Sequence, residues 1–534
     1  MIQSQGTRLF KRSMVAAWAA ALLGLAGVRS PEAAATQWRV ENAFPHMTFA
    51  DPVALAAAPV SGWIYVAEQE GLLLAFPPDS SVREKVIVLE ITTQTQGGFG
   101  KEDCGLLGFA FHPEFGKAGS PNRGFLYVYY NYSDKPVVPP AGQKLSSDTH
   151  SRNRLSRFTV PDGTLQADPK SELVLIDQTD TQTWHNGGGM FFNPMDGFLY
   201  LTNGDEGCNC HNDQKLDKSL FSGVFRIDVD NRGGSVSHSI RRQPVNGKTA
   251  YYSIPNDNPF VGDGMLEEFW ALGLRSPHRM TYDAPGDLIW LGDVGNGYRE
   301  EVDIVRKGAN YQWTLEEGPS QHPKPAAAPG IWTDPIHYYD HQGSSNAIIG
   351  GYVYRGCANA EDLGGKYVFG DFGHNTVSAM TFNPSATLGA EKTQVDELLT
   401  LPLQGDYVNG LTSFGVDAKG ELYLLTLGQE AKIWKLAGPH TRTDCANNAI
   451  RPQGNAAVTP FPVRSGAGGI IFDAPDGLAY TVGITALDGR LLAQASPKGR
   501  FIFHPGPGGF PAGVVLVRIG SRGRVWNFRT PLLP

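Results

Sequence analysis

A weak sixfold repeat constrains the fold of this chain more than any other feature of its sequence. Within residues 37–440, each copy has a turn, an aromatic-rich strand, a loop and a second strand. The aromatic-rich strands are expected at 62–66, 124–128, 197–201, 287–291, 366–369 and 421–425. Six such units at irregular spacing predict an all-β fold, a six-bladed β-propeller with long insertions in its loops. Propellers carry their sites on such loops, around one end of the central channel.

The character of the sequence changes after the last copy. Residues 441–465 are mostly polar and contain prolines, as expected for a linker. Residues 466–534 contain short alternating strands, which predict a small C-terminal β-sandwich of about seven strands.

The first 35 residues have the pattern of a signal peptide. Lys11 and Arg12 precede an apolar run from Met14 to Val28, and small residues at 33–35 suit cleavage before Thr36. The run is short and alanine-rich for a membrane-spanning helix, so we expect no membrane span in the mature chain. We expect an exported protein that is periplasmic, cell-surface or secreted. The net charge of −8 gives no support to nucleic-acid binding.

The five cysteines are Cys104, Cys208, Cys210, Cys357 and Cys445. An odd number in an exported chain leaves at least one unpaired or paired between chains. Cys357 could pair with Cys445, and Cys104 could pair with Cys208 or Cys210. The Cys208 to His211 segment has a poor spacing for zinc.

A histidine and an aspartate flank one predicted hairpin. His185 precedes the apolar run 190–192, and Asp205 follows the apolar run 198–201. If the two runs pair as antiparallel strands, both side chains finish at the same edge of the sheet. A carboxylate that orients an imidazole is a general-base arrangement. The alternative is a hairpin in which the histidine only caps a loop.

Eight segments, in order, resemble the glucose/sorbosone dehydrogenase family. This family holds the soluble aldose sugar dehydrogenases that depend on pyrroloquinoline quinone (PQQ) and proteins of the hedgehog-interacting type. The segments are 105–115, 185–188, 204–205, 273–277, 292–295 with 300–302, 308–311, 350–356 and 369–372. The resemblance spans roughly residues 40–437 and implies a six-bladed propeller.

The resemblance also implies catalytic roles and two cofactors, PQQ and Ca²⁺. His185 would take the proton of a sugar hydroxyl, Asp205 would orient that histidine, and Arg275 would contact the quinone oxygens. Calcium would be held in the loop that contains Gly295 and Asn296.

Other positions that would line the cofactor are Asp103, Asn186, Ser276 and Arg355. Two of them depart from the family pattern: Asp103 stands where the enzymes have an amide, and Ser276 where they have asparagine. The regions 371–375 and 407–412 also lack the family's lysine and arginines for the cofactor carboxylates. Each lost charge-assisted contact weakens binding by roughly 1.5–3 kcal/mol. Arg355 or His374 are candidates to replace them.

Three functions follow from these patterns. The first is an exported oxidoreductase that oxidises an aldose at its anomeric hydroxyl with PQQ and passes electrons to an external acceptor. The second is a non-catalytic propeller that binds a carbohydrate or a protein, and the third is a structural surface protein. The C-terminal segments 479–482, 487–492 and 510–518 resemble secretion-sorting β-modules of bacterial exported proteins.

Overall fold

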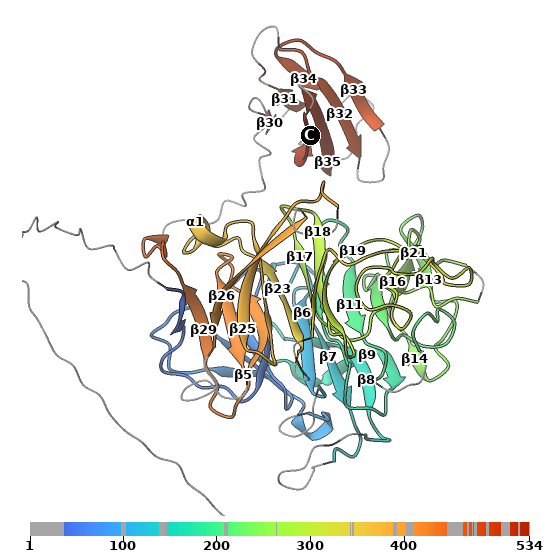
Figure 1. The fold of residues 1–534 in the computed structure, drawn as a ribbon, viewed down its shortest axis with the longest axis vertical. Helices are drawn as coiled ribbons and strands as arrows, with labels where there is room; N and C mark the ends of the chain where they lie inside the picture. The colour runs from blue at the N-terminus through green and yellow to red at the C-terminus, as the bar shows by residue number, and fades with distance from the viewer. Residues whose placement is uncertain are drawn as a thin grey trace, which may run out of the picture. The chain divides into compact units, whose positions relative to one another are not determined.

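The computed structural model describes two stretches of the chain, 37–445 and 463–532 (Figure 1). Within them it leaves out 98–102, 138–144, 146, 208–211, 263, 342, 344–345, 388–391, 402–409, 467–468, 473, 475–477, 487–490, 504–512 and 522–523. The predicted signal peptide and most of the predicted linker lie outside the described residues. The described part is nearly all β-structure, as predicted, and none of its helices is long and apolar enough to cross a membrane.

A ring of strands organises the larger stretch. Each of these strands, which we call ring strands, contacts the next, and β27 pairs with β2 in parallel. The ring strands are β2 (Pro52–Ala57), β6 (Leu106–Phe111), β10 (Met190–Phe192), β17 (Pro277–Asp283), β23 (Ile348–Val353) and β27 (Leu411–Val416). The number of blades that these strands build stays a prediction.

Each ring strand begins an antiparallel sheet that runs outward. The first three sheets continue with β3 (Ile64–Glu68), β4 (Leu72–Phe76) and β5 (Val86–Glu90); β7 (Phe125–Tyr132), β8 (Arg152–Thr159) and β9 (Asp168–Thr179); and β11 (Leu199–Asn203), β12 (Gly223–Ile227) and β16 (Phe269–Leu272). The others continue with β18 (Leu288–Asp293), β19 (Arg299–Val305) and β22 (His337–Asp340); β24 (Tyr367–Asp371), β25 (Thr376–Phe382) and β26 (Thr393–Thr400); and β28 (Leu422–Thr426), β29 (Ile433–Ala437) and β1 (Arg39–Asn42). The repeat seen in the sequence therefore marks the second and third strand of each sheet.

Short elements decorate the loops between these sheets. They are β13 (Ser237–Ser239), β14 (Gly247–Thr249), β15 (Ser253–Pro255), β20 (Ala309–Asn310), β21 (Ile331–Trp332), the 3₁₀ turn η1 (Thr92–Gln94) and the helix α1 (Ala360–Leu363). The disulfide Cys357–Cys445 joins the α1 region to the chain beyond β29, which confirms one predicted pairing. Cys104 is buried and free, so the predicted bridge to Cys208 or Cys210 was wrong. Its sulfur lies 3.7 Å from the Asn186 amide nitrogen, inside a polar network.

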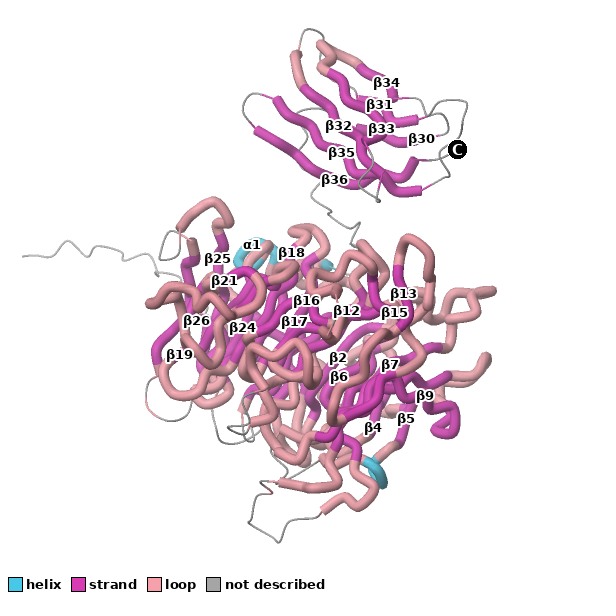
Figure 2. Tube along the Cα trace, turned by 90° about the vertical axis from the view of Figure 1, so that its right-hand side faces the viewer, coloured by secondary structure: helices cyan, strands magenta, loops and turns pink. Residues whose placement is uncertain are grey.

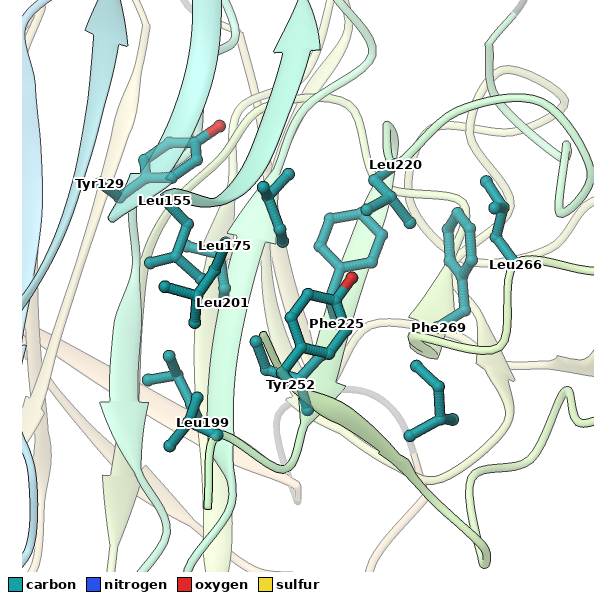
Figure 3. Close-up of a cluster of buried hydrophobic side chains, with 14 of the residues drawn as sticks. Tyr129, Leu155, Leu175, Leu199, Leu201, Leu220, Phe225, Tyr252, Leu266 and Phe269 are labelled. Carbon is teal, nitrogen blue, oxygen red and sulfur yellow. The ribbon is translucent and has the colours of Figure 1, made fainter. Parts of the chain in front are cut away.

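Aromatic and aliphatic side chains fill the space between neighbouring sheets. In one interface, Tyr129 of β7 and Leu155 of β8 pack near Leu199 and Leu201 of β11 and Phe225 of β12 (Figure 3). All five side chains are at most 2% exposed. Because side chains alternate across a strand, the apolar positions of each strand face an adjacent sheet. The aromatic residues of the repeat are buried in the same way, among them Tyr65, Tyr127, Tyr200 and Trp290, which are at most 3% exposed.

The C-terminal stretch forms two sheets of its own (Figure 2). One contains β30 (Val463–Gly466), β31 (Gly469–Phe472) and β34 (Phe501–Phe503). The other contains β33 (Leu491–Ala495), β32 (Thr481–Ala486), β35 (Gly513–Ser521) and β36 (Arg524–Leu532). Both sheets contribute to one buried cluster, which includes Phe472, Val482 and Ile519. Such shared burial is what a sandwich requires, and the predicted sandwich stays a prediction.

Candidate functional site

The predicted hairpin forms, and it brings His185 and Asp205 together. Strands β10 and β11 pair antiparallel, with Met190 opposite Leu201. His185 Nδ1 lies 2.6 Å from Asp205 Oδ1. The His185 side chain is 14% exposed and the Asp205 side chain 9%, so the pair is largely shielded from water but still reachable.

The backbone around this pair is tightly fixed. His185 has a φ of +60°, a region that non-glycine residues rarely adopt. Its N–H donates to Asp103 Oδ2 at 3.1 Å, and its carbonyl accepts from the Gly204 N–H at 3.0 Å. A Cβ on Gly204 would lie 2.1 Å from the His185 carbonyl and 2.6 Å from the Arg275 carbonyl. Only glycine fits there, so the Gly-Asp motif serves to bring the two loops together.

Asp205 remains ionised in spite of its burial. Burial raises the pKa of this carboxyl, but hydrogen bonds from His185, Gly207 and Trp313 outweigh it, so the pKa is lowered overall. The Trp313 indole N–H donates to Asp205 Oδ2 at 2.8 Å, and the Gly207 N–H donates to Oδ1 at 2.9 Å. A charged Asp205 keeps the proton of the neutral imidazole on Nδ1, which leaves Nε2 as the acceptor.

Arg275 reaches the same edge from the turn before β17. Its backbone N–H and that of Ser276 donate to the two oxygens of Asp293, at 2.9 and 2.7 Å. Burial raises the pKa of Asp293 to about 7, against these hydrogen bonds. The Asp205 N–H donates to the Arg275 carbonyl at 2.9 Å, and the Arg275 guanidinium lies 5.5 Å from the centroid of the Trp313 ring system.

The guanidinium of Arg275 is held by the loop that follows β18. It donates to the carbonyl oxygens of Val294 (3.0 Å) and Gly295 (2.7 Å), and to Asn296 Oδ1 (3.3 Å). The positions predicted to hold calcium therefore lie beside Arg275, and their oxygens accept its protons. Among the described residues, no group of three or more His, Cys, Asp or Glu side chains is placed to hold a metal ion.

Two predicted cofactor residues point elsewhere. Asn186 is 1% exposed, and its amide bonds Asn131 Nδ2 (2.7 Å) and Cys104 Sγ (3.7 Å) inside the protein. Arg355 pairs with both oxygens of Asp283, at 2.9 and 2.7 Å. Asp283 ends β17, whereas Ser276 precedes it, so Arg355 lies about 20 Å away along that strand.

A second histidine–carboxylate pair lies near Arg275. His341 Nε2 is 2.6 Å from Glu300 Oε1, and the Ile348 N–H donates to Glu300 Oε2 at 2.8 Å. Burial, helped by the nearby Asp371 carboxylate, raises the pKa of Glu300 to about 9, against the hydrogen bond from Ile348. His374 Nδ1 in turn lies 3.3 Å from Asp371 Oδ1.

Sequence reasoning did not find Trp313, Asp293 or the Glu300–His341 pair. Glu300 lies in the family segment 300–302, but only its backbone partner Ile348, 48 residues away, shows how its carboxyl group is held. Asp293 follows the predicted strand 287–291 and lies within the family motif 292–295, a position that could have marked it. Trp313 lies 108 residues from its partner Asp205, and no local pattern indicates that contact.

The family model described as Glucose / Sorbosone dehydrogenase matches residues 49–435. The chain belongs to this family. The HIPL1 protein of Arabidopsis thaliana is 30% identical over 375 residues, which cover 61% of this chain and 52% of that protein. The human Hedgehog-interacting protein is 28% identical over 400 residues, 70% of this chain and 49% of that protein. The chain thus spans about half the length of these curated relatives.

Solved structures of the family share the fold. The PQQ-bound aldose sugar dehydrogenase from Streptomyces coelicolor superposes with a TM-score of 0.50 at 18% identity, covering 75% of this chain and 98% of that one. The family contains oxidoreductases, while proteins of the hedgehog-interacting type stand among the relatives of this chain.

Proposed function

We propose that this chain is an exported oxidoreductase that oxidises an aldose-type sugar at its anomeric hydroxyl, with PQQ as hydride acceptor. The observation that carries this proposal is the His185–Asp205 pair, 2.6 Å apart. Nε2 of His185 makes no hydrogen bond with any described residue, which leaves it available to a sugar hydroxyl. An oriented imidazole of this kind contributes roughly 10²–10⁴-fold to proton transfer.

The residues of the chain divide the work as follows. His185 Nε2 takes the hydroxyl proton, and the ionised Asp205 stabilises the imidazolium that results. Trp313 and Gly207 hold Asp205 in place through hydrogen bonds to its two oxygens. Asp293 positions the Arg275 turn, whose guanidinium supplies positive charge beside the pair.

The residues present fit the quinone end of PQQ. When bound, PQQ supplies a two-electron acceptor, which an external electron acceptor must then reoxidise. Arg275 would hold its quinone oxygens, and Gly295 and Asn296 would hold Ca²⁺ once the guanidinium releases them. The carboxylate end finds fewer partners in the described region, because Arg355 is distant and Arg299 already pairs with Asp340 at 3.0 Å. We therefore expect weaker PQQ binding than a full set of cations would give.

A non-catalytic binding propeller is the second candidate. Two features favour it. The Arg275 guanidinium donates its hydrogen bonds to the protein's own oxygen atoms. Carboxyl groups such as Asp205 also lie at this edge, where they would oppose the binding of the anionic PQQ. Its ligand would be a carbohydrate or a protein partner bound on the same loops.

The architecture enters the proposal as well. We expect the ring strands to build six blades over residues 37–440, followed by a linker at 441–465 and a C-terminal sandwich at 466–534. The contacts from each ring strand to the next, and the β27–β2 pairing, support this arrangement. Residues 1–35 would act as the signal peptide, and the sandwich would act in sorting or anchoring.

Titration of the calcium-loaded, full-length exported protein with PQQ tests the proposal. A dye-reduction assay over a panel of aldoses should follow, with His185→Ala and with His238→Ala as a matched control, because His238 also pairs with a carboxylate (Glu267, 2.8 Å) but has no role in the proposed site. Saturable PQQ binding, with dye reduction that is lost in His185→Ala and retained in His238→Ala, would support the dehydrogenase. Absence of binding at micromolar PQQ would overturn it in favour of the binding propeller.

A further inference from the structure

A second charged group, Arg279, is buried on the inner side of the ring strands. Its residue is 8% exposed and lies in β17, four positions after Arg275. It lines a cavity of about 70 Å³ to which every ring strand contributes residues. Neither the proposed sugar oxidation nor the proposed binding function uses this residue.

Backbone irregularities explain how an arginine is accommodated there. The pairing register shifts at Val53 in β2, at Leu107 in β6 and at His278 in β17, so each of these residues is an extra residue in its strand. A bulged residue is released from the regular ladder of hydrogen bonds. The carbonyl oxygens of all three accept hydrogen bonds from the Arg279 guanidinium. The Nε–H group donates to Ser413 Oγ of β27 at 2.9 Å.

These partners satisfy hydrogen bonds but supply no negative charge. All four acceptors are neutral, and the described residues contain no ion pair to Arg279. Arg226, which is 3% exposed, provides the contrast within the same protein. It pairs with Asp196 at 3.2 Å and with Asp257 at 2.7 Å. Because burying a charge without a counter-charge is strongly unfavourable, a buried arginine is normally paired as Arg226 is.

The cavity offers both space and a further donor. Its volume of about 70 Å³ exceeds the roughly 10–15 Å³ that a single water needs. Glycines at 108, 188, 189 and 350 line part of its wall, and a Cβ at each would come within 2.1–2.7 Å of a neighbouring segment. Tyr352 also lines it, and no described residue makes a hydrogen bond with the Tyr352 hydroxyl. One N–H of the guanidinium is likewise left over, because a guanidinium has five and the described acceptors use four.

We propose that this cavity between the ring strands is a binding site for a small monovalent anion, held between the Arg279 guanidinium and the Tyr352 hydroxyl. The anion supplies a counter-charge in direct contact with Arg279. None of the described carboxylates forms an ion pair with this guanidinium, and Asp103 acts on it only from a greater distance. It is either a free ion of halide size or a carboxylate group of a ligand bound above the cavity, at the His185 edge. The ring strand carrying Arg279 begins at that edge, about 10–13 Å away along β17.

Thermal unfolding of the full-length protein tests this site. Isethionate, a larger sulfonate that carries no carboxylate group, is replaced by bromide at constant ionic strength. Binding to the folded state should raise the unfolding midpoint saturably, by about 1–2 °C at tenfold excess over Kd. Tyr352→Phe keeps the buried charge and should weaken the bromide dependence. Tyr354→Phe, whose hydroxyl bonds Glu421 at 2.6 Å, is the matched control and should retain it.

Anomalous diffraction from bromide-soaked crystals locates the ion directly. A bromide peak beside the guanidinium would support the site, and its displacement by PQQ would identify a ligand carboxylate as the occupant. Retention of bromide with PQQ bound would identify a free ion. A wild-type protein with neither a peak nor a midpoint shift would overturn the proposal, because water and carbonyl groups alone would then solvate Arg279.

Discussion

The pairs His185–Asp205 and His341–Glu300 have the same separation and opposite electrostatics. In each, a histidine nitrogen lies 2.6 Å from a carboxyl oxygen. Asp205 receives three hydrogen bonds that lower its pKa, whereas Glu300 is fully buried and its pKa is raised to about 9. At neutral pH the first pair contains a carboxylate, and the second contains a carboxylic acid that can itself donate a proton to His341. The hydrogen-bond donors and the neighbouring charges around the carboxyl group, and not the residue pair, decide which chemistry is available.

The largest expected effect comes from neutralising the first carboxylate. Asp205→Asn removes the charge that fixes the His185 tautomer and stabilises the imidazolium, so kcat for dye-linked sugar oxidation should fall about a thousandfold. KM should change little, because Asp205 is a positioning residue that does not touch the sugar. Steady-state kinetics will give kcat and KM for Asp205→Asn and for the matched control Glu300→Gln, which should keep most of its activity. A kcat within threefold of the parent would mean that His185 does not act as a base oriented by Asp205.

The two carboxyl groups should also give opposite pH dependence of stability. The folded protein holds the Glu300 proton more tightly than the unfolded chain does. The contribution of Glu300 to the free energy of unfolding is therefore fully present below about pH 4.5 and is lost as the pH rises towards about 9. The Asp205 contribution is present above its unfolded pKa of 3.8 and is lost as pH falls through its lowered folded pKa. Urea unfolding across pH should show that Glu300→Gln removes a slope of up to about 1.4 kcal/mol per pH unit between about pH 4.5 and pH 9. Asp205→Asn should change only the acid side, and equal pH profiles for the two variants would contradict the comparison.

A smaller effect is expected from one donor to Asp205. Trp313→Phe keeps an aromatic ring but removes the 2.8 Å hydrogen bond to Oδ2. Loss of this hydrogen bond to the charged Asp205 should lower kcat about tenfold. It should also move the acid limb of the pH–rate profile to higher pH. Tyr339→Phe, which removes a 2.8 Å bond to Asp371, serves as the control and should leave that limb in place. An unchanged limb in Trp313→Phe would show that Trp313 does not tune the pair.

The smallest effect is expected from Glu300→Gln at neutral pH. Glutamine resembles the protonated acid that the raised pKa implies, and it can still accept the Ile348 N–H. Activity at pH 7 should stay within about twofold of the parent. A much larger loss, measured with the same dye assay, would indicate that Glu300 is ionised and that the two pairs are chemically alike.

The strands and their hairpins follow from the sequence alone. Alternating apolar positions and turn residues fix each strand locally, so the repeat predicted the second and third strand of every sheet that starts from a ring strand. The same local logic placed His185 and Asp205 at one edge, because a short antiparallel hairpin has few possible registers. The family motifs placed Arg275 in the same neighbourhood, and the structure brings it there.

The tertiary structure decided the partners of these groups. Trp313, Asp293 and the loop at 294–296 meet the pair because sheets far apart in sequence close against one another, and no local pattern carries that information. Arg355 and Arg279 differ for the same reason: one finds a carboxylate at the far end of β17, and the other finds three carbonyl groups and a serine hydroxyl. Sequence sets which side chains are available, while the electrostatic state of each depends on burial and on donors brought from distant strands.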